Sequence, residues 1–299
     1  MLKKTINRSI FYFVFFLSSI VYLLSSMTSL VCAQKPLRIV TSFYPMYIMA
    51  LNVTKDIPGV VVENLTSSQT GCLHDYALTP DDMKKLTGAN LFVANGAGME
   101  NFLNNITARY SQIKIVQLAD GISLIKNGND INPHVWTSIS NAIKEVENLS
   151  KALEIADPSH QKAYSDNAHA YVIKLKKIQT LMHKELYMYI GEKIITFHEA
   201  FPYFAQEFGL NIAAVIEREP GSEPSAKELA DTIDLVKKTG IKALFTEPQY
   251  PALAAQTIAQ ETEAKIFTLD PAVTGPEEPD AYINIMTKNL KVLKSAFTQ

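Results

Sequence analysis

The sequence has few cysteines, only Cys32 and Cys72 among its 299 residues, and no strong excess of charge of either sign. Cys32 lies in an N-terminal segment that we expect to be removed, which would leave Cys72 without a disulfide partner. We interpret the Cys72 thiol as a small buried apolar side chain. The formal net charge of −2 argues against a nucleic-acid partner, because phosphate binding requires a clustered basic surface.

Several catalytic signatures are also absent from the sequence. It contains no glycine-rich phosphate loop, no GxSxG nucleophile elbow and no paired catalytic cysteine and histidine motif. In "HEAFP" at 198–202, Pro202 stands where a zinc-protease helix would need its second histidine. We found no fixed-period repeat and no low-complexity tract. These absences exclude the simplest hydrolases and the repeat architectures.

Residues 1–33 have the features of an export signal. Three basic residues before position 9 precede an uncharged stretch that ends at Ala33, which is the order of a secretory signal peptide. Val31 and Ala33 are suitably small for cleavage before Gln34. The apolar run is also long enough for an uncleaved membrane anchor, whereas lipid attachment at Cys32 is disfavoured by Val31. We expect an exported protein, in the periplasm or on the outer face of the cytoplasmic membrane, with its attachment left open.

The rest of the chain alternates short β-rich runs with helical patterns, which predicts parallel sheets covered by helices. The predicted strands form two sets of four: Leu37–Thr41, Val60–Leu65, Asn90–Ala94 and Lys114–Leu118, then Lys193–Phe197, Asn211–Ile216, Lys242–Thr246 and Lys265–Leu269. Each set is sufficient for a small doubly wound domain.

Between the two sets, Asp157 to Tyr189 contains no glycine and has proline only near its beginning. Apolar residues recur there at helical spacing, which predicts one long helix. The predicted fold is therefore α/β, with two small doubly wound parallel-sheet lobes, 34–156 and 190–299, joined by one long backbone helix, 157–189. Such a helix would limit how far the lobes can close on each other.

Four side chains with metal-binding chemistry follow predicted strands. His198 and Asp270 each come directly after a strand of the second set, while His74 and His134 lie in loops after the second and fourth strands of the first set. Ligands of open parallel sheets gather outside the carboxyl ends of the strands. Three imidazoles and one carboxylate make a suitable tetrahedral set for Zn²⁺. The four side chains are therefore candidate ligands of one metal ion in an interlobe cleft.

The remaining candidates have weaker signals. His160, His169 and His183 lie within the predicted long helix at spacings that do not chelate a metal, so we interpret them as surface residues. Glu247 also ends a strand and is a candidate to orient a ligand imidazole. The aromatic side chains near the histidines form either a wall of the site or ordinary core: Trp136, Phe197, Phe201 and Tyr203.

The chain resembles the metal-binding receptors of ABC importers for zinc and manganese, a group that includes periplasmic zinc-binding and streptococcal manganese-binding lipoproteins. The resemblance covers nearly all of the chain after the signal and rests on specific motifs: "IVTSFYPMY", "HDYALTPDDMKKL", "ANGAGMENFL", "NPHVW", "TFHEAFPYFAQEFGL", "EPSAKEL", "ALFTEPQ" and "TLDP".

The resemblance implies two α/β lobes joined by a backbone helix, one divalent ion in the cleft and delivery of that ion to a membrane permease. The family's ligand positions correspond to His74, His134, His198 and Asp270. Two features depart from the zinc receptors. The His-rich acidic loop before the second ligand is reduced to "GISLIKNGND", and Leu73 replaces the acid that some members have before the first histidine.

The leading hypothesis is a monomeric receptor for Zn²⁺ uptake that is not an enzyme. The nearest alternative is a manganese or iron receptor of the same family. A secreted zinc hydrolase with Glu199 as base is a hypothesis from another class, and it requires an open coordination position that Asp270 would close. A receptor for haem or another iron chelate is a further alternative, which three separated strand-end histidines argue against.

Overall fold

The computed structural model describes residues 35–74, 76–128, 130–216 and 224–298. Residues 37–299 form one compact unit. The predicted signal peptide, residues 1–33, lies outside the described residues. Within the described ranges, no helix combines the length and hydrophobicity that crossing a membrane requires.

The first sheet is parallel, with four strands in the order β2-β1-β3-β4. Their bounds are β1 Leu37–Thr41, β2 Val60–Asn64, β3 Leu91–Ala94 and β4 Lys114–Gln117. Every residue of the inner strand β3 is buried, as expected for a strand covered on both faces. All four strands were predicted to within one residue at each end.

The second sheet is also parallel, with four strands in the order β10-β9-β7-β8. Their bounds are β7 Lys193–Thr196, β8 Asn211–Val215, β9 Ala243–Thr246 and β10 Lys265–Thr268, again within one residue of the predicted strands. In both sheets the first strand along the chain lies between the second and the third. The two sheets thus share one topology. In each, the second strand lies on one side of the first and the third strand lies on the other side, so the direction of the strand order changes between the first and third strands.

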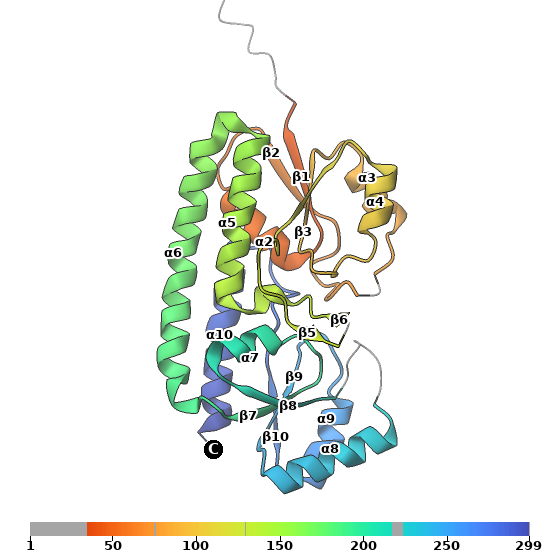
Figure 1. The fold of residues 1–299 in the computed structure, drawn as a ribbon, viewed down its shortest axis with the longest axis vertical. Helices are drawn as coiled ribbons and strands as arrows, with labels where there is room; N and C mark the ends of the chain where they lie inside the picture. The colour runs from red at the N-terminus through yellow and green to blue at the C-terminus, as the bar shows by residue number, and fades with distance from the viewer. Residues whose placement is uncertain (1–34, 75, 129, 217–223, 299) are drawn as a thin grey trace, which may run out of the picture. The chain divides into compact units, whose positions relative to one another are not determined.

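Helices and short turns connect the strands (Figure 1). The α-helices are α2 Tyr44–Val53, α3 Pro80–Leu86, α4 Leu103–Arg109, α5 Ile139–Ala156, α6 Gln161–Leu186, α7 Pro202–Phe208, α8 Ala226–Thr239, α9 Leu253–Glu261 and α10 Ala281–Phe297. The 3₁₀ turns are η1 Val135–Thr137, η2 Pro158–His160 and η3 Tyr187–Tyr189. A small antiparallel hairpin, which the sequence did not reveal, pairs β5 Lys126–Asn127 with β6 Asp130–Ile131.

The long helix between the sheets is confirmed, but it is shorter than predicted. The α-helical part α6 has 26 residues, about 39 Å at 1.5 Å per residue. Residues 158–160 form a separate 3₁₀ turn, because Pro158 has no N–H to donate and follows Asp157, which ends α5 in a non-helical conformation. His160 therefore precedes the α-helix, and only His169 and His183 lie within it.

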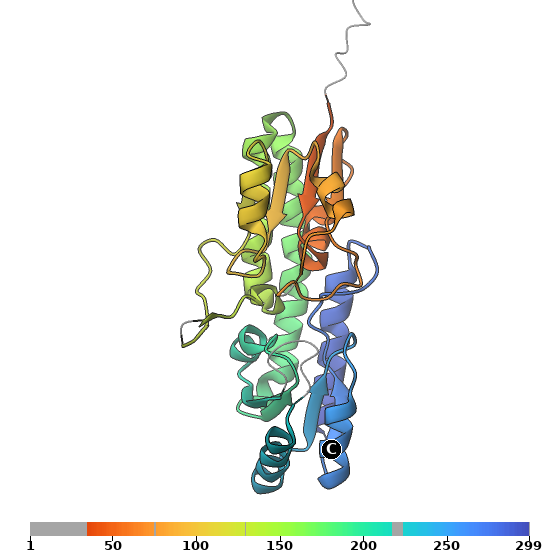
Figure 2. The same ribbon diagram turned by 90° about the vertical axis from the view of Figure 1, so that its right-hand side faces the viewer.

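The helix α6 does not join the sheets alone. It packs against α5, α2 and α10. Figures 1 and 2 show α5 beside the part of α6 next to the first sheet and α10 beside the part next to the second sheet. The C-terminal helix α10 also contacts α2 of the first sheet's lobe. One continuous buried core runs through both lobes, so the connection resists bending better than an isolated helix would.

Two helices, α3 and α8, begin with complete capping boxes. The Thr79 hydroxyl accepts the N–H of Asp82, whose carboxylate accepts the Thr79 N–H in return. Ser225 and Glu228 form the same reciprocal pair before α8, which ends at Gly240 with φ of 68°. These capping boxes satisfy backbone donors that a helix N-terminus leaves free. The first of them fixes the exit of the loop that carries His74.

Candidate metal centre

His198 and Glu247 meet where the second sheet reverses its winding. The strands β7 and β9 that precede them are adjacent and parallel, so their following loops leave the same edge of the sheet. The His198 Nδ1 lies 3.2 Å from the Glu247 Oε1, and both side chains are almost wholly buried. The other imidazole nitrogen, His198 Nε2, is buried without a hydrogen-bond partner among the described residues.

His134 is held by a neighbour in its own loop. The Asn132 Oδ1 accepts the backbone N–H of His134 at 3.0 Å and lies 3.1 Å from its Nδ1. The Asn132 Nδ2 in turn donates to the carbonyl oxygen of Glu199 at 2.7 Å. The residue that orients His134 therefore also binds the loop that carries His198.

His74 completes a triangle of imidazoles. Its Nε2 lies 3.1 Å from the His134 Nε2, and Asn101 donates to its backbone carbonyl at 2.7 Å. The ring centroids are 4.9 Å apart for His74 and His134, 5.7 Å for His74 and His198, and 4.7 Å for His134 and His198. The structure thus brings the three predicted histidines together from both lobes.

Cys72 joins the three histidines, a position that the sequence interpretation missed. One ligand atom from each of the four side chains lies within 4.8 Å of the others. The Cys72 side chain is half-buried, packs against the edge of the main apolar core and lies beside the imidazoles. The Cys-x-His spacing of residues 72 and 74 was the available signal, since side chains two residues apart can project to the same side of an extended segment.

Asp270, the fourth predicted ligand, does not belong to this group among the described residues. Its Oδ1 accepts the N–H of Ala272 at 2.8 Å, and its backbone is bound on both sides by the Asn289 amide. Burial raises the pKa of the Asp270 carboxyl, and the Ala272 N–H opposes that shift. Asp270 as a ligand stays a prediction, since its second carboxylate oxygen is not engaged by this hydrogen bond.

Burial also sets the protonation of the ligand group. Desolvation, followed by repulsion from His198 and His74, holds the pKa of His134 well below 6.5. Desolvation, followed by the charge of Glu247, raises the pKa of the Cys72 thiol well above 9.0. At neutral pH His134 is therefore a neutral imidazole with a lone pair available to a metal.

The spacing of the His74 and His134 nitrogens suits an ion with tetrahedral coordination. With Zn–N bonds of about 2.0–2.1 Å, two imidazole ligands of a tetrahedral zinc lie about 3.3 Å apart. The observed separation between the Nε2 atoms of His74 and His134 is 3.1 Å. A Zn²⁺ ion could therefore enter between these two rings with only a small displacement of either.

Among the aromatic residues named from the sequence, Trp136 belongs to the core and also contacts a ligand ring. Trp136 is fully buried, lies 5.3 Å from the His134 ring between centroids, and donates its Nε1–H to the Pro271 carbonyl at 2.8 Å. Phe201 and Tyr203 are also buried. Such surroundings exclude water and strengthen electrostatic interactions at the histidines.

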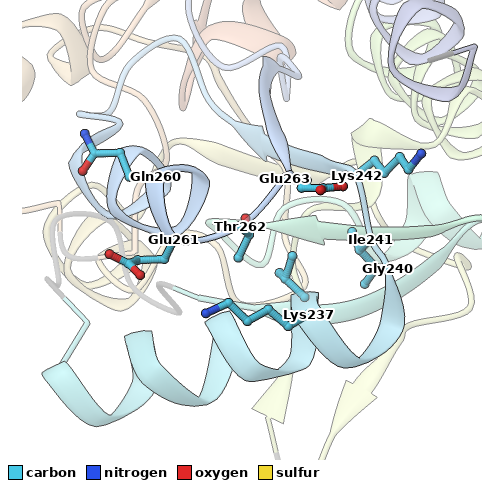
Figure 3. A pocket seen from close by; sticks show the side chains of 9 residues that line it. Lys237, Gly240, Ile241, Lys242, Gln260, Glu261, Thr262 and Glu263 are labelled. Atoms are coloured by element: carbon cyan, nitrogen blue, oxygen red, sulfur yellow. The ribbon is translucent and has the colours of Figure 1, made fainter.

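The other predicted assignments are consistent with a single site. His169 and His183 are exposed on α6, and His160 contacts the Asp157 carboxylate at 2.7 Å. Pro202 begins α7, so no second histidine can follow Glu199 on a zinc-protease helix. A hollow elsewhere in the second lobe (Figure 3) contains no histidine or cysteine; it is lined by Val236, Lys237, Gly240, Ile241, Lys242, Gln260, Glu261, Thr262 and Glu263.

Known proteins are similar to this chain in sequence and in fold. The chain is 30% identical over 281 residues to the high-affinity zinc uptake system protein ZnuA of Bacillus subtilis (strain 168), covering 87% of each chain. It is also 30% identical over 288 residues to the zinc-binding lipoprotein AdcA of Streptococcus pneumoniae (strain ATCC BAA-255 / R6), covering 89% of this chain but 57% of that protein.

Among solved structures, the chain is similar to the solute-binding protein FpvC from Pseudomonas aeruginosa in complex with Mn²⁺. That similarity has a TM-score of 0.80 and 28% sequence identity, and it covers 88% of this chain and 99% of that one. The family described as zinc-uptake complex component A, periplasmic, matches residues 39–296. Because that match spans both lobes, the chain belongs to the zinc-uptake complex component A family.

Proposed function

We propose that this chain is an extracytoplasmic receptor that captures one divalent metal ion, Zn²⁺, and delivers it to the permease of an ABC importer. The observation that carries the proposal is the convergence of His74, His134 and His198 from two lobes, with the His198 Nε2 buried and unpartnered. A buried polar nitrogen without a partner costs about 1–3 kcal/mol. A bound metal ion would remove that cost.

Capture without catalysis fits the residues around the group. Glu199, the candidate base of the alternative hydrolase, is followed by Pro202 at the start of α7, where a zinc-protease helix would carry its second histidine. Family membership also supports a receptor that binds and releases its cargo unchanged. We further propose a monomer. We also propose that it has no nucleic-acid partner, since the net charge of −2 argues against the clustered basic surface that phosphate binding requires.

An exported location fits the signal-like start of the sequence and the family description as periplasmic. The AdcA relative is a lipoprotein, which makes the outer face of the cytoplasmic membrane the alternative to a free periplasmic protein. In either place the metal reaches the protein before it reaches the cell interior. The partner that receives it is the membrane permease.

Zinc is favoured over manganese and iron by the chemistry of the donors. Imidazole nitrogens suit Zn²⁺, whereas Mn²⁺ prefers oxygen donors and higher coordination. The manganese or iron alternative has specific support in the Mn²⁺ complex of the similar protein FpvC. Competition between the two ions separates these alternatives.

The experiment is a competitive titration of the metal-free protein with Zn²⁺ and Mn²⁺ against a calibrated chelator. Replacing His74, His134 or His198 with Ala should each weaken Zn²⁺ binding more than roughly a hundredfold, because loss of an outer partner alone costs about 10–100-fold. The exposed helix histidines provide matched controls, His169→Ala and His183→Ala, which should bind as the unmodified protein does. Full affinity in any one of the three loop variants would contradict the proposed site.

A further inference from the structure

The position of Cys72 relative to the three histidines is not explained by packing alone. Its neighbour Leu73 is fully buried in the core, whereas Cys72 is half-buried at the edge of that core and next to the imidazoles. Gly71 precedes it with φ of +84°, and a Cβ there would lie 3.5 Å from the Tyr250 Oη of the other lobe. The segment that carries Cys72 therefore lies against the second lobe's wall of the site.

A second observation points independently to a ligand at this place. The His198 side chain is 2% exposed, and its Nε2 has no hydrogen-bond partner among the described residues. Its Nδ1 is already occupied by Glu247. The His198 imidazole belongs to the same ligand group as the Cys72 sulfur, and Nε2 is the ring nitrogen that does not face Glu247. We therefore infer that an ion bound to Nε2 lies within reach of the thiol.

We propose that Cys72 is the fourth ligand of the ion, as a thiolate, and that the site binds thiophilic divalent cations through three nitrogens and one sulfur. This inference rests on the proposed function and assigns a ligand that the family resemblance did not supply. On binding, one metal–sulfur bond forms, the S–H bond breaks heterolytically, and the proton passes to solvent. The metal keeps its oxidation state, so the step needs no oxidant or reductant.

The geometry favours Cys72 over Asp270 for this position. The Asp270 Oδ1 accepts the Ala272 N–H at 2.8 Å and the carboxylate lies outside the ligand group, whereas the Cys72 sulfur already belongs to it. Tetrahedral zinc with one thiolate places sulfur about 3.5 Å from each nitrogen. The group, whose ligand atoms lie within 4.8 Å of one another, reaches that geometry by a contraction of about 1 Å.

A thiolate changes which ions the site selects. Thiolates favour Zn²⁺ and softer ions and disfavour Mn²⁺, which prefers carboxylate and carbonyl oxygens. A thiolate also leaves the zinc site with one net positive charge, as the predicted aspartate would. Cys72 therefore preserves the charge that the predicted aspartate would give the site, while its sulfur donor favours softer metal ions.

The test uses Co²⁺ as a spectroscopic probe of sulfur coordination. The full chain carries Cys32→Ser in every sample, so that Cys72 is its only thiol. We expect Co²⁺ to produce an intense near-ultraviolet sulfur-to-cobalt charge-transfer band that Cys72→Ser removes and Asp270→Asn retains. Zn²⁺ affinity should fall more than roughly tenfold in Cys72→Ser.

Co²⁺ bound at one equivalent without this band would overturn the assignment of Cys72 and leave the receptor function intact. Persistence of the band in a folded Cys72→Ser protein would overturn it as well. The spectrum of the protein with Cys72 present decides the question even if the serine variant does not fold. A failure of the proposed function gives a different result. The unmodified protein would then bind neither Co²⁺ nor Zn²⁺, and His134→Ala would not change the affinity for either ion.

Discussion

The Glu247 carboxylate lies behind the His198 imidazole, with its Oε1 3.2 Å from Nδ1 and both side chains almost wholly buried. Gln249 donates to the other carboxylate oxygen at 2.6 Å. A carboxylate in this place favours a proton on Nδ1, which leaves the Nε2 lone pair facing the ligand group. The adjacent strands β7 and β9 thereby position His198 and the carboxylate that orients it.

Removing this carboxylate should weaken the metal site without touching a ligand. We expect Glu247→Ala to reduce Zn²⁺ affinity by about 10–100-fold, because the His198 ring loses the partner that sets its orientation and proton. Glu247→Gln should lose less, since its amide oxygen can still accept from Nδ1–H. Competitive titration measures both variants.

The control for the Glu247→Ala variant changes Glu263, an exposed glutamate beside the hollow of Figure 3. Glu263→Ala should leave Zn²⁺ affinity unchanged. Equal affinity of Glu247→Ala and the unmodified protein would show that the buried carboxylate does not act on the metal site.

Metal binding should compete with protons at the histidines. Their unperturbed pKa is about 6.5, and only neutral imidazoles bind. We expect Zn²⁺ affinity to fall steeply below about pH 6, with more than one proton taken up per ion released. His134 should contribute little to this uptake, because desolvation holds its pKa well below 6.5. Calorimetry in buffers of different ionisation enthalpy counts the protons. The Cys72→Ser variant removes the proton that a coordinated thiolate would take up, and uptake near zero in that variant would contradict a three-histidine site.

The sequence predicted the strands well because their signals are local. The predicted strand at 60–65 ends one residue later than β2, and the predicted strand at 90–94 begins one residue earlier than β3. Apolar runs bounded by polar or turn residues define such strands. The break at Pro158 was also visible in principle, yet the helical pattern on both sides concealed it.

The metal group was only partly predictable because it depends on tertiary contacts. Strand ends identified His74, His134 and His198, since parallel strands deliver their loops to one edge. The approach of Cys72 depends on the path of a loop without regular structure, and no strand or helix fixes that path. The Asp270 turn is likewise set by contacts with Ala272 and Asn289 that periodicity does not encode.

A pair of buried carboxylates in the first lobe should make stability depend on pH. Glu145 of α5 is fully buried, and both its oxygens lack partners among the described residues. Desolvation, followed by the charge of Glu100, raises its pKa well above 4.5. Desolvation likewise raises the pKa of Glu100 to about 7, against hydrogen bonds that include the N–H groups of Asn95 and Gly96.

The sign of the effect follows from these raised pKa values. Above about pH 4.5 the unfolded chain releases protons that the folded protein keeps, so raising the pH favours unfolding until the folded pKa values are passed. Between about pH 5 and about pH 8, we expect the unfolding free energy to fall less in Glu145→Gln than in the unmodified protein. Glu145→Met should also raise stability at the upper end by about 1–3 kcal/mol, because it removes an unsatisfied polar group.

Denaturant titration across this pH range measures the unfolding free energy. Glu147, exposed on the same helix, gives the control Glu147→Gln, which should follow the unmodified protein. An unchanged pH slope in Glu145→Gln would show that this carboxyl does not carry the effect.

The preference for zinc should depend on the donor at position 198. A carboxylate there suits Mn²⁺ better than an imidazole does, but His198→Glu alone would place a second carboxylate against Glu247, 3.2 Å from the present Nδ1. Two adjacent buried carboxylates cannot both ionise readily, so we expect the single variant to bind both ions poorly. The double variant His198→Glu with Glu247→Gln removes the repulsion and should reduce the Zn²⁺ over Mn²⁺ preference by at least about tenfold. Competitive titration of the unmodified protein and both variants with the two ions gives the ratio directly. Because Glu247→Gln alone keeps the imidazole, it should retain the zinc preference, and a similar drop in that control would assign the change to Glu247 instead of His198.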